Sequence, residues 1–441
     1  MTATLSRYRN RVLGLLFLLS SMTFLDRVCI SVAGPRMQAD LGMTPQMWGW
    51  VMGVFTLSYS LFEIPSGAMG DRFGPRKTLS RIVIWWSAFT TITGFVSSFR
   101  SLLIVRFLFG AGEAGAYPNS SAVVARWFPV AERARAHSII WMAGLLGAGL
   151  TPMVVVPIQM RYGWRQSFLC FGGLGIVWAI VWYGWFRDNP TQKGGVSAAE
   201  LAEIDAGPAR VHVPLPWGAV LRTRNFWMII LSYFCYCCGS NFYLTWLPTY
   251  LQSGRHMSES QMAVASMFPF ILGAITNLMW GWLGDALVRR HGLRIGRRTI
   301  GTIGLAAGGA FLMATVISPT NRLAVAFLTL AYCSMTSVLS SAWAVCLDVG
   351  RQWAGSLTGA MNTAGQLGAL TSTVAFGYMV SYFRSYSTPL IPLAIVLLVG
   401  ACFFYRIDPC EQIASERGGT ATAYGTDQAE DEVATPHEGG Q

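Results

Sequence analysis

Charged residues are scarce in this chain of 441 residues: they make up 12% of the sequence, whereas apolar residues make up 53%. A soluble domain carries about twice that share of charge, so the composition excludes an ordinary soluble protein. Histidine is also rare. Its five copies are dispersed and none has a second ligand at metal-site spacing, so we expect neither a metal site nor a cofactor.

Long apolar segments account for the missing charge. Each is long enough to cross a hydrocarbon core of about 30 Å, and at this length only helices satisfy their own backbone hydrogen bonds in lipid. The segments lie at 11–32, 47–69, 78–98, 101–124, 136–160, 166–187, 225–250, 260–285, 299–318, 321–346, 353–381 and 386–405. The sequence therefore predicts an all-α polytopic membrane protein with twelve transmembrane helices in two six-helix bundles.

A polar stretch separates the two sets of segments and defines the predicted domains. It contains several prolines and glycines, as expected of a linker. The last part of the chain is acidic and rich in Gly, Thr and Ala, which is typical of disorder. We predict an N-terminal six-helix bundle at 1–187, a cytoplasmic linker at 188–224, a C-terminal six-helix bundle at 225–408 and a disordered cytoplasmic tail at 409–441.

The positions of the 32 Lys and Arg residues predict the orientation in the membrane. Most lie at the two ends and in the even-numbered connections, so both termini should be cytoplasmic. The exceptions in odd-numbered connections are Arg36, Arg100, Arg161, Arg165, Arg255, Arg322 and Arg384. The net charge of +11 thus reflects topology, and we expect no nucleic-acid binding. We expect a multi-pass monomer in the lipid bilayer of a cell inner (plasma) membrane.

Four charged residues lie inside two of the apolar segments. Asp26 and Arg27 are adjacent in the first segment, and Arg106 and Glu113 lie seven residues apart in the fourth. A charge at the bilayer centre costs about 2.5 to 3.5 kcal/mol on insertion scales, so each needs a function or a partner. Arg106 and Glu113 share a helix face but are separated by about 10 Å of rise, which disfavours a direct pair. Their partners should therefore come from the first segment, and the four residues form the candidate active centre.

A short motif recurs at the ends of the second and eighth segments. Its small residues permit close approach of helices, and an acid followed by arginines can form ion pairs at the cytoplasmic boundary. We predict a cytoplasmic gate formed by Gly67, Asp71, Arg72, Arg76, Asp285 and Arg289. Because the repeat has the same orientation in both halves, it indicates parallel duplication of a six-helix unit.

From 11 to 405 the chain resembles the major facilitator superfamily, and more narrowly the anion:cation symporter family, which includes bacterial hexuronate, galactonate and glucarate transporters and sialin. The motifs that carry the resemblance are Asp26-Arg27, Tyr59 six residues before Pro65, the run from Arg106 to Pro118, Trp246-Leu247-Pro248 and Asn362. The resemblance implies a secondary active transporter, not an enzyme, that carries a small organic anion, such as a sugar acid or related carboxylate, together with protons by alternating access. It also implies that Arg27 receives the substrate carboxylate and that Glu113 takes up the coupled proton.

The depth of each residue, at about 1.5 Å per position, predicts the pairs Asp26 with Arg106 and Arg27 with Glu113. A substrate anion that displaced Glu113 from Arg27 would leave the acid to bind a proton, so both would load together. Asp26 could orient Arg106 or share the proton, and it is a second candidate for coupling. We expect the substrate-binding groups to be Arg27, Arg106, Tyr59, Tyr243, Asn362, Ser337 and Gln366.

Other interpretations compete with symport. The four charges could form a permanent brace between helices. An organophosphate or other anion exchanger would need a second cation in the seventh segment, but 225–250 has no Lys or Arg. A non-transporting anion receptor on the same fold would need an obvious partner domain, which the linker and tail do not provide. For Glu63, in the second segment, we expect a local structural pairing in preference to proton transport.

Overall fold

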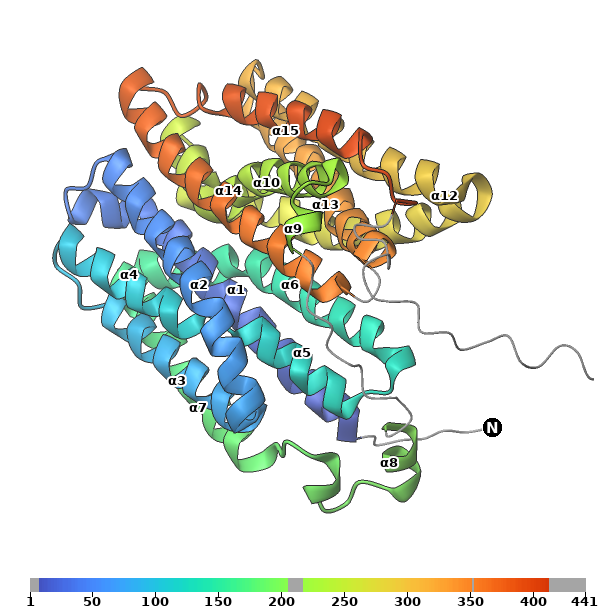
Figure 1. The fold of residues 1–441 in the computed structure, drawn as a ribbon. Helices are drawn as coiled ribbons and strands as arrows, with labels where there is room; N and C mark the ends of the chain where they lie inside the picture. Colours follow the sequence, from blue (N-terminus) through green and yellow to red (C-terminus); the bar gives the residue numbers. More distant parts are fainter. Residues whose placement is uncertain (1–7, 205–216, 351–352, 412–441) are drawn as a thin grey trace, which may run out of the picture.

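The computed structural model describes residues 8–204, 217–350 and 353–411, in which the chain forms helices and connections and no strand. Two helical halves lie against each other, with a linker between them in the sequence (Figure 1). The first half comprises α1 (Tyr8–Asp40), α2 (Pro45–Phe73), α3 (Pro75–Thr93), α4 (Phe99–Glu113), α5 (Ala116–Trp127), α6 (Val130–Tyr162) and α7 (Trp164–Trp185). The second comprises α10 (Arg224–Thr245), α11 (Leu247–Thr249), η2 (Tyr250–Gly254), α12 (Glu259–Val316), α13 (Asn321–Gly350), α14 (Ala354–Phe383) and α15 (Leu390–Tyr405).

The linker contains only short helices in its described part. These are η1 (Pro190–Gln192), α8 (Ala198–Ile204) and α9 (Trp217–Val220). Residues 205–216 of the predicted linker and 412–441 of the predicted tail lie outside the described residues.

Three predicted spans differ from single straight helices. The fourth span is broken into α4 and α5, because Gly115 has a left-handed backbone with φ of 88° and packs directly against Ser66. The eighth and ninth spans are joined in α12, whose backbone turns sharply at Gly292, with φ of 82°. Both turns require conformations that glycine adopts without strain.

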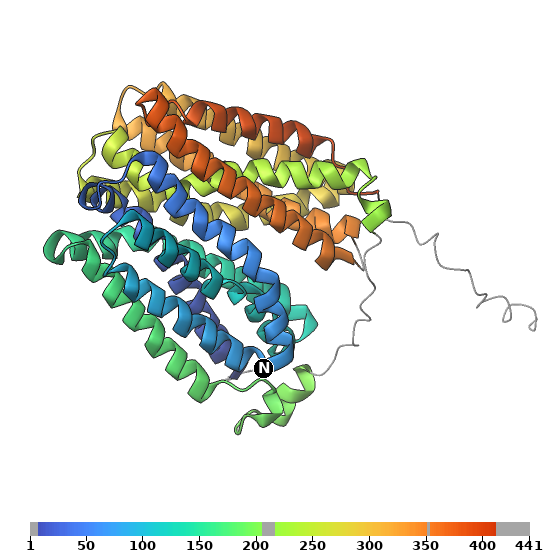
Figure 2. The ribbon, with the colours of Figure 1, turned by 60° about the vertical axis from the view of Figure 1, so that its left-hand side comes forward.

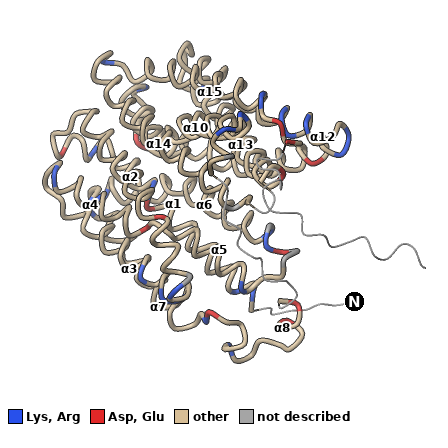
Figure 3. Tube along the Cα trace, in the orientation of Figure 1, with Lys and Arg blue, Asp and Glu red and all other residues tan. Residues whose placement is uncertain are grey.

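Length and composition alone mark α1, α7, α12, α13 and the Arg135–Tyr162 part of α6 as able to cross a membrane. Serine caps begin two of the helices: Ser98 and Ser101 form a reciprocal capping box at α4, and Ser258 and Gln261 do so at α12. Figure 3 shows that Lys and Arg gather near the helix ends, with few charged positions along the helices.

The halves pack in equivalent ways. Helix α1 packs on α6 in the first half, and α10 packs on α14 in the second. Between the halves, α2 packs on α14 and α6 packs on α12. In Figures 1 and 2 the halves lie close at one end and diverge toward the end where α1 begins and α15 finishes. We call this the terminus side and the other end the opposite side.

Contacts across the halves concentrate on the opposite side. Arg36 binds Glu259 through two hydrogen bonds of 2.8 and 3.0 Å, and Trp50 Nε1 donates to Tyr378 Oη at 3.2 Å. Close packing accompanies these bonds, since a Cβ added to Gly49 would lie 3.1 Å from a carbonyl oxygen of α14. The described structure is therefore closed on the opposite side.

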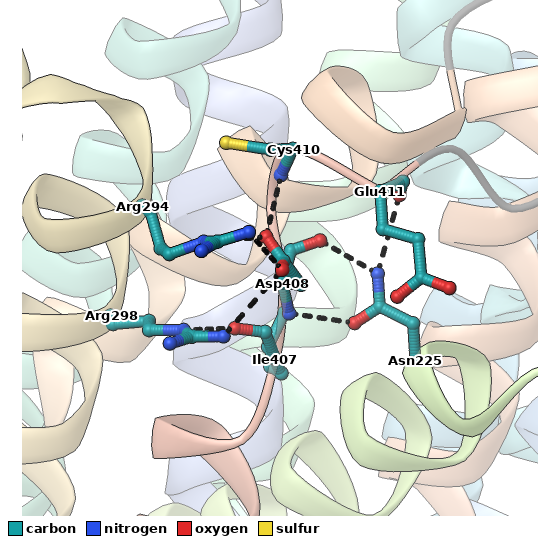
Figure 4. A network of polar contacts seen from close by, with 7 residues as sticks. All are labelled: Asn225, Arg294, Arg298, Ile407, Asp408, Cys410 and Glu411. Atoms are coloured by element: carbon teal, nitrogen blue, oxygen red, sulfur yellow. Dashed lines mark hydrogen bonds and ion pairs between the residues drawn. The ribbon is translucent and has the colours of Figure 1, made fainter.

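On the terminus side, the end of α15 is tied to its own half by a polar network (Figure 4). Arg294 of α12 binds Asp408 at 2.6 Å, and Asn225 of α10 donates to the Asp408 carbonyl at 2.8 Å. Although partial burial opposes ionisation, the Cys410 backbone N–H and the Arg294 guanidinium hold the pKa of Asp408 below its ordinary value. The network thus fixes the segment after α15 to α10 and α12.

Candidate functional site

Arg27 and Glu113 form a buried ion pair in the first half. Arg27 Nε lies 2.6 Å from Glu113 Oε1, and the Glu113 side chain is only 1% exposed. Arg27 Nη2 and Glu113 Oε2 are also buried, and neither has a hydrogen-bond partner among the described residues. The predicted pair is present, but it is joined by one bond where a guanidinium and a carboxylate can form two.

The local fold explains why Glu113 needs this partner. Glu113 is the last residue of α4, where the helix dipole places partial negative charge that disfavours a carboxylate. Gly110 brings α4 against α2, because a Cβ there would lie 2.6 Å from the Phe55 carbonyl oxygen. Glu113 is therefore held in a closely packed, buried position where Arg27 supplies the compensating charge.

Aromatic rings surround the Arg27 guanidinium. Its Cζ lies 4.7 Å from the ring centroid of Tyr59, 5.2 Å from that of Phe55 and 5.6 Å from that of Phe24. Ring faces stabilise a cation without neutralising it, so Arg27 keeps a positive charge available to an anion. Tyr59 is 3% exposed and its ring lies beside Arg27, while its role in substrate binding stays a prediction.

The predicted pair between Asp26 and Arg106 is not formed, and that prediction is wrong for this structure. Both residues are described and buried, yet no ion pair within 4 Å joins them. Arg106 instead lies over the rings of Phe55 and Phe109, at 4.7 and 4.8 Å. In the part of the chain that the structure describes, Asp26 Oδ1 and Arg106 Nε are buried and have no hydrogen-bond partners. Depth along a helix placed the two residues at one level, but it did not determine the direction of each side chain.

A row of aromatic side chains extends from this centre to the second half, and none of them was predicted as a site residue. Tyr117 hydrogen-bonds Ser20 at 3.0 Å and stacks on Trp141 at 4.7 Å. Trp141 meets Trp343 of α13 edge to face at 6.4 Å. The signal available in the sequence was Tyr117, which lies within the motif that runs from Arg106 to Pro118.

Two predicted substrate-binding residues lie in contacts between helices of the second half. Tyr243 is fully buried, and its hydroxyl donates to the Leu328 carbonyl at 2.8 Å. Ser337 is also fully buried and packs against Gly304, where any larger side chain would clash. Each hydroxyl faces a neighbouring helix in this conformation, and a role for either residue in substrate binding stays a prediction.

Asn362 and Gln366 lie on α14 and are both half-buried. Asn362 donates to Glu63 Oε2 at 3.3 Å, a contact that joins the second half to the first. The expectation of a local pairing for Glu63 is therefore wrong, because its partner comes from the other half of the molecule. A role for Asn362 and Gln366 in substrate binding stays a prediction.

The predicted gate residues contact their own halves. Arg76 donates through Nε and Nη2 to the Tyr183 carbonyl at 2.9 and 2.6 Å, and Asp285 binds Arg297 at 3.3 Å. Arg72 and Arg289 are exposed, and a Cβ on Gly67 would lie 3.5 Å from Pro118. The Asp71 side chain lies outside what the structure describes. A latch between the halves at these residues stays a prediction.

Comparison with known proteins places this arrangement among transporters. The model of the Major Facilitator Superfamily matches residues 16–373. The chain is similar to a probable sulfoacetate transporter of Cupriavidus necator, with 33% identity over 91% of this chain and 94% of that protein. It is also similar to a probable galactarate/D-glucarate transporter of Escherichia coli, with 30% identity over 89% of this chain and 91% of that protein.

A solved structure shows the same fold. It is a bacterial homologue of the human lysosomal transporter Spinster in an inward-facing, occupied conformation. The two superpose with a TM-score of 0.76 at 19% identity, over 90% of this chain and 96% of the other. Together the matches confirm the predicted all-α fold with twelve transmembrane helices in two six-helix bundles.

Proposed function

Since the chain belongs to the major facilitator superfamily and is a multi-pass membrane transporter, not an enzyme, we propose that it carries a small organic anion by proton-coupled symport. The contact between Arg27 and Glu113 is the observation on which this proposal rests. Its one-bond geometry leaves a buried donor and a buried acceptor unused, so the pair can open to an anion without losing a complete set of hydrogen bonds.

The proposed cycle is an exchange of partners at Arg27. A substrate carboxylate or sulfonate binds the guanidinium through two oxygens and displaces Glu113. Glu113 then remains at the carboxyl end of α4 without its counter-ion, a position that favours the neutral acid. A proton taken up by Glu113 neutralises its unpaired carboxylate. The protein, loaded with anion and proton, can then change from one access state to the other. Coupling follows because neither charge is left unpaired in the membrane.

Asp26 and Arg106 complete the charge balance of the site. Both are buried and lack a direct partner in the described structure. We infer that Asp26 is a second proton-coupling acid and that Arg106 holds a positive potential near the substrate, where its two ring contacts fix its position. Tyr59 lies beside Arg27 and is the neutral group placed best to contact the anion.

The orientation also belongs to the proposal. The bias of Lys and Arg toward the terminus side supports cytoplasmic termini in a bacterial inner membrane. The structure, closed on the opposite side, then corresponds to an inward-facing state of a monomer. The exchanger alternative gains no support from the geometry, because α10 carries no Lys or Arg beyond Arg224 at its start.

Uptake into proteoliposomes tests this function. The panel comprises radiolabelled sulfoacetate, D-glucarate, D-galactonate and a hexuronate, each measured with and without an inward proton gradient, for the native protein and Glu113→Gln. We expect gradient-driven uptake by the native protein, and loss of accumulation with retained anion exchange in Glu113→Gln. Exchange serves as the control for folding. Native uptake that ignores the gradient would contradict proton symport, and failure to take up any acid would favour a receptor.

A further inference from the structure

Glu63 is a charged side chain in the membrane that the proposed cycle does not use. It lies on α2, one helical turn from Tyr59 toward the terminus side, and is half-buried. Its carboxylate accepts a hydrogen bond of 3.3 Å from Asn362 on α14. In the described part of the chain, no Lys, Arg or His nitrogen lies within 4 Å of that carboxylate.

The groups around Glu63 form no ion pair with it within the described residues. Helices α1, α3, α4, α5 and α14 pack against α2. Their charged or titratable residues in the middle of the bundle include Asp26, Arg27, Arg106, Glu113 and Tyr117, and α3 adds Arg76, Lys77 and Arg81 near its start. Arg27 already binds Glu113, Arg81 contacts Met69, and Arg76 binds the end of α7. Helix α14 carries no charged residue, so Asn362 supplies a neutral amide and no cation.

A carboxylate in this setting needs a proton or a counter-ion. Opposite charge is absent at contact distance, and charged groups inside membrane spans are costly and usually functional. An amide donor stabilises a carboxylate only modestly compared with an ion pair. Rocking of the halves around a central site changes any contact between them. The bond between Glu63 and Asn362 therefore changes in each cycle, and with it the access of the carboxylate to water.

We propose that Glu63 is a further proton-carrying group beside Glu113 and Asp26, and that it binds one proton of its own in each transport cycle. This inference rests on the proposed symport function. The proton enters as the halves reorient and leaves to the terminus side, where the halves diverge. Asn362 holds the carboxyl group against the moving interface. The protein thereby moves one proton more per anion than it would with the site around Arg27 alone.

The test measures proton and anion flux in the same proteoliposomes, with a pH-sensitive dye inside and the panel anion that the native protein takes up fastest. The variants are Glu63→Gln, Glu63→Asp and, as a matched control, Glu259→Gln, which alters another acid that contacts across the halves. Glu63→Gln should move one proton fewer per anion. Its accumulation at a pH gradient of one unit should fall about tenfold, because each coupled proton contributes a factor of ten per unit. Glu63→Asp and Glu259→Gln should keep the native ratio.

An unchanged ratio in Glu63→Gln would overturn the proposal. Failure of symport itself would show differently, since the native protein would then move anion without protons. If Glu63→Gln were inactive in transport, we would measure how many protons the solubilised variant and the native protein bind when the same anion is added. Less uptake than in the native protein supports the proposal, and equal uptake overturns it.

Discussion

The first half carries Asp26, Arg27, Glu63, Arg106 and Glu113 inside its spans, whereas the spans of the second half are neutral except near their ends. Both halves nevertheless use equivalent helices to pack internally and against each other. The two halves share their helix packing but not their buried charges. The packing of the fold therefore does not depend on the charged residues of the first half. In the proposed cycle, the first half holds the charged groups that exchange partners, and the second half supplies a neutral surface that moves against them.

The neutral half still takes part in the site through a few side chains. Asn362 contacts Glu63, and Trp343 meets Trp141, which stacks on Tyr117. Each contact joins an uncharged group of the second half to a residue near the charged centre. A change of charge at the centre can therefore affect the second half through these neutral contacts and does not require an ion pair between the halves there.

The largest expected effect comes from Arg27→Lys, which keeps the charge of the first half but removes the planar guanidinium. Lysine cannot bind a carboxylate through two parallel hydrogen bonds or lie flat on the Tyr59 ring. We expect KM to rise on the order of 10- to 100-fold, which corresponds to about 1.4 to 2.8 kcal/mol. Initial uptake rates across a concentration series measure this. Unchanged KM would show that the anion binds elsewhere.

A smaller effect should follow from Glu259→Gln, which breaks the one ion pair that joins the two halves within the described residues, that with Arg36. A partly exposed pair contributes about 1 kcal/mol, so the closed state of the opposite side should weaken. Apparent affinity for anion supplied from that side should then improve on the order of fivefold. KM for external anion in oriented vesicles measures it.

The control for Glu259→Gln is Asp40→Asn, which breaks a pair of 2.6 Å between Asp40 and Arg165 within the first half. Because that pair does not cross the halves, it should leave the external KM unchanged. Equal effects of both variants would contradict a specific role for the contact between the halves.

Much of this organisation could be predicted from the sequence. The lengths of the apolar runs predicted the spans, and the scarcity of charge in them selected the centre, because a membrane penalises charge strongly. The pair of Arg27 and Glu113 followed from depth, which advances regularly along a helix. The break after Glu113 had a visible signal in Gly112, Gly115 and the nearby Pro118, although a continuous helix was expected.

The direction of polar side chains could not be predicted. Tyr243 and Ser337 were expected to face the substrate, but they lie between helices of their own half. In a membrane bundle, both the lipid-facing and protein-facing sides of a helix are apolar, so one chain gives little indication of its rotation. The contact of Glu63 with Asn362 joins positions 299 residues apart and depends on the packing of α2 on α14.

Matched Tyr→Phe changes sharpen the contrast between the halves. Tyr243→Phe should lower the free energy of unfolding by about 1 kcal/mol, because its hydrogen bond to Leu328 is lost, and leave KM unchanged. Tyr59→Phe keeps the ring beside Arg27 but removes the hydroxyl, so it should raise KM several-fold with little change in stability. Thermal unfolding in detergent and uptake kinetics separate the two. A raised KM in Tyr243→Phe would mean that the Tyr243 hydroxyl contributes to substrate binding.

The smallest expected effect lies at the neutral half's own surface, where Asp408→Asn removes the centre of the network in Figure 4. Because the pKa of Asp408 is lower in the folded protein, its stabilising contribution is present above its ordinary value and is lost as the pH falls through the folded value. The variant should therefore melt slightly below the native protein at pH 7, and the difference should shrink only below about pH 4. Glu411→Gln is the matched control, since Glu411 contributes its backbone carbonyl to the network. A melting difference that stayed constant down to pH 2 would show that the carboxylate charge is not what stabilises this end of the chain. Unchanged uptake in both variants is expected, because the network lies within one half and outside the path between Arg27 and Glu63.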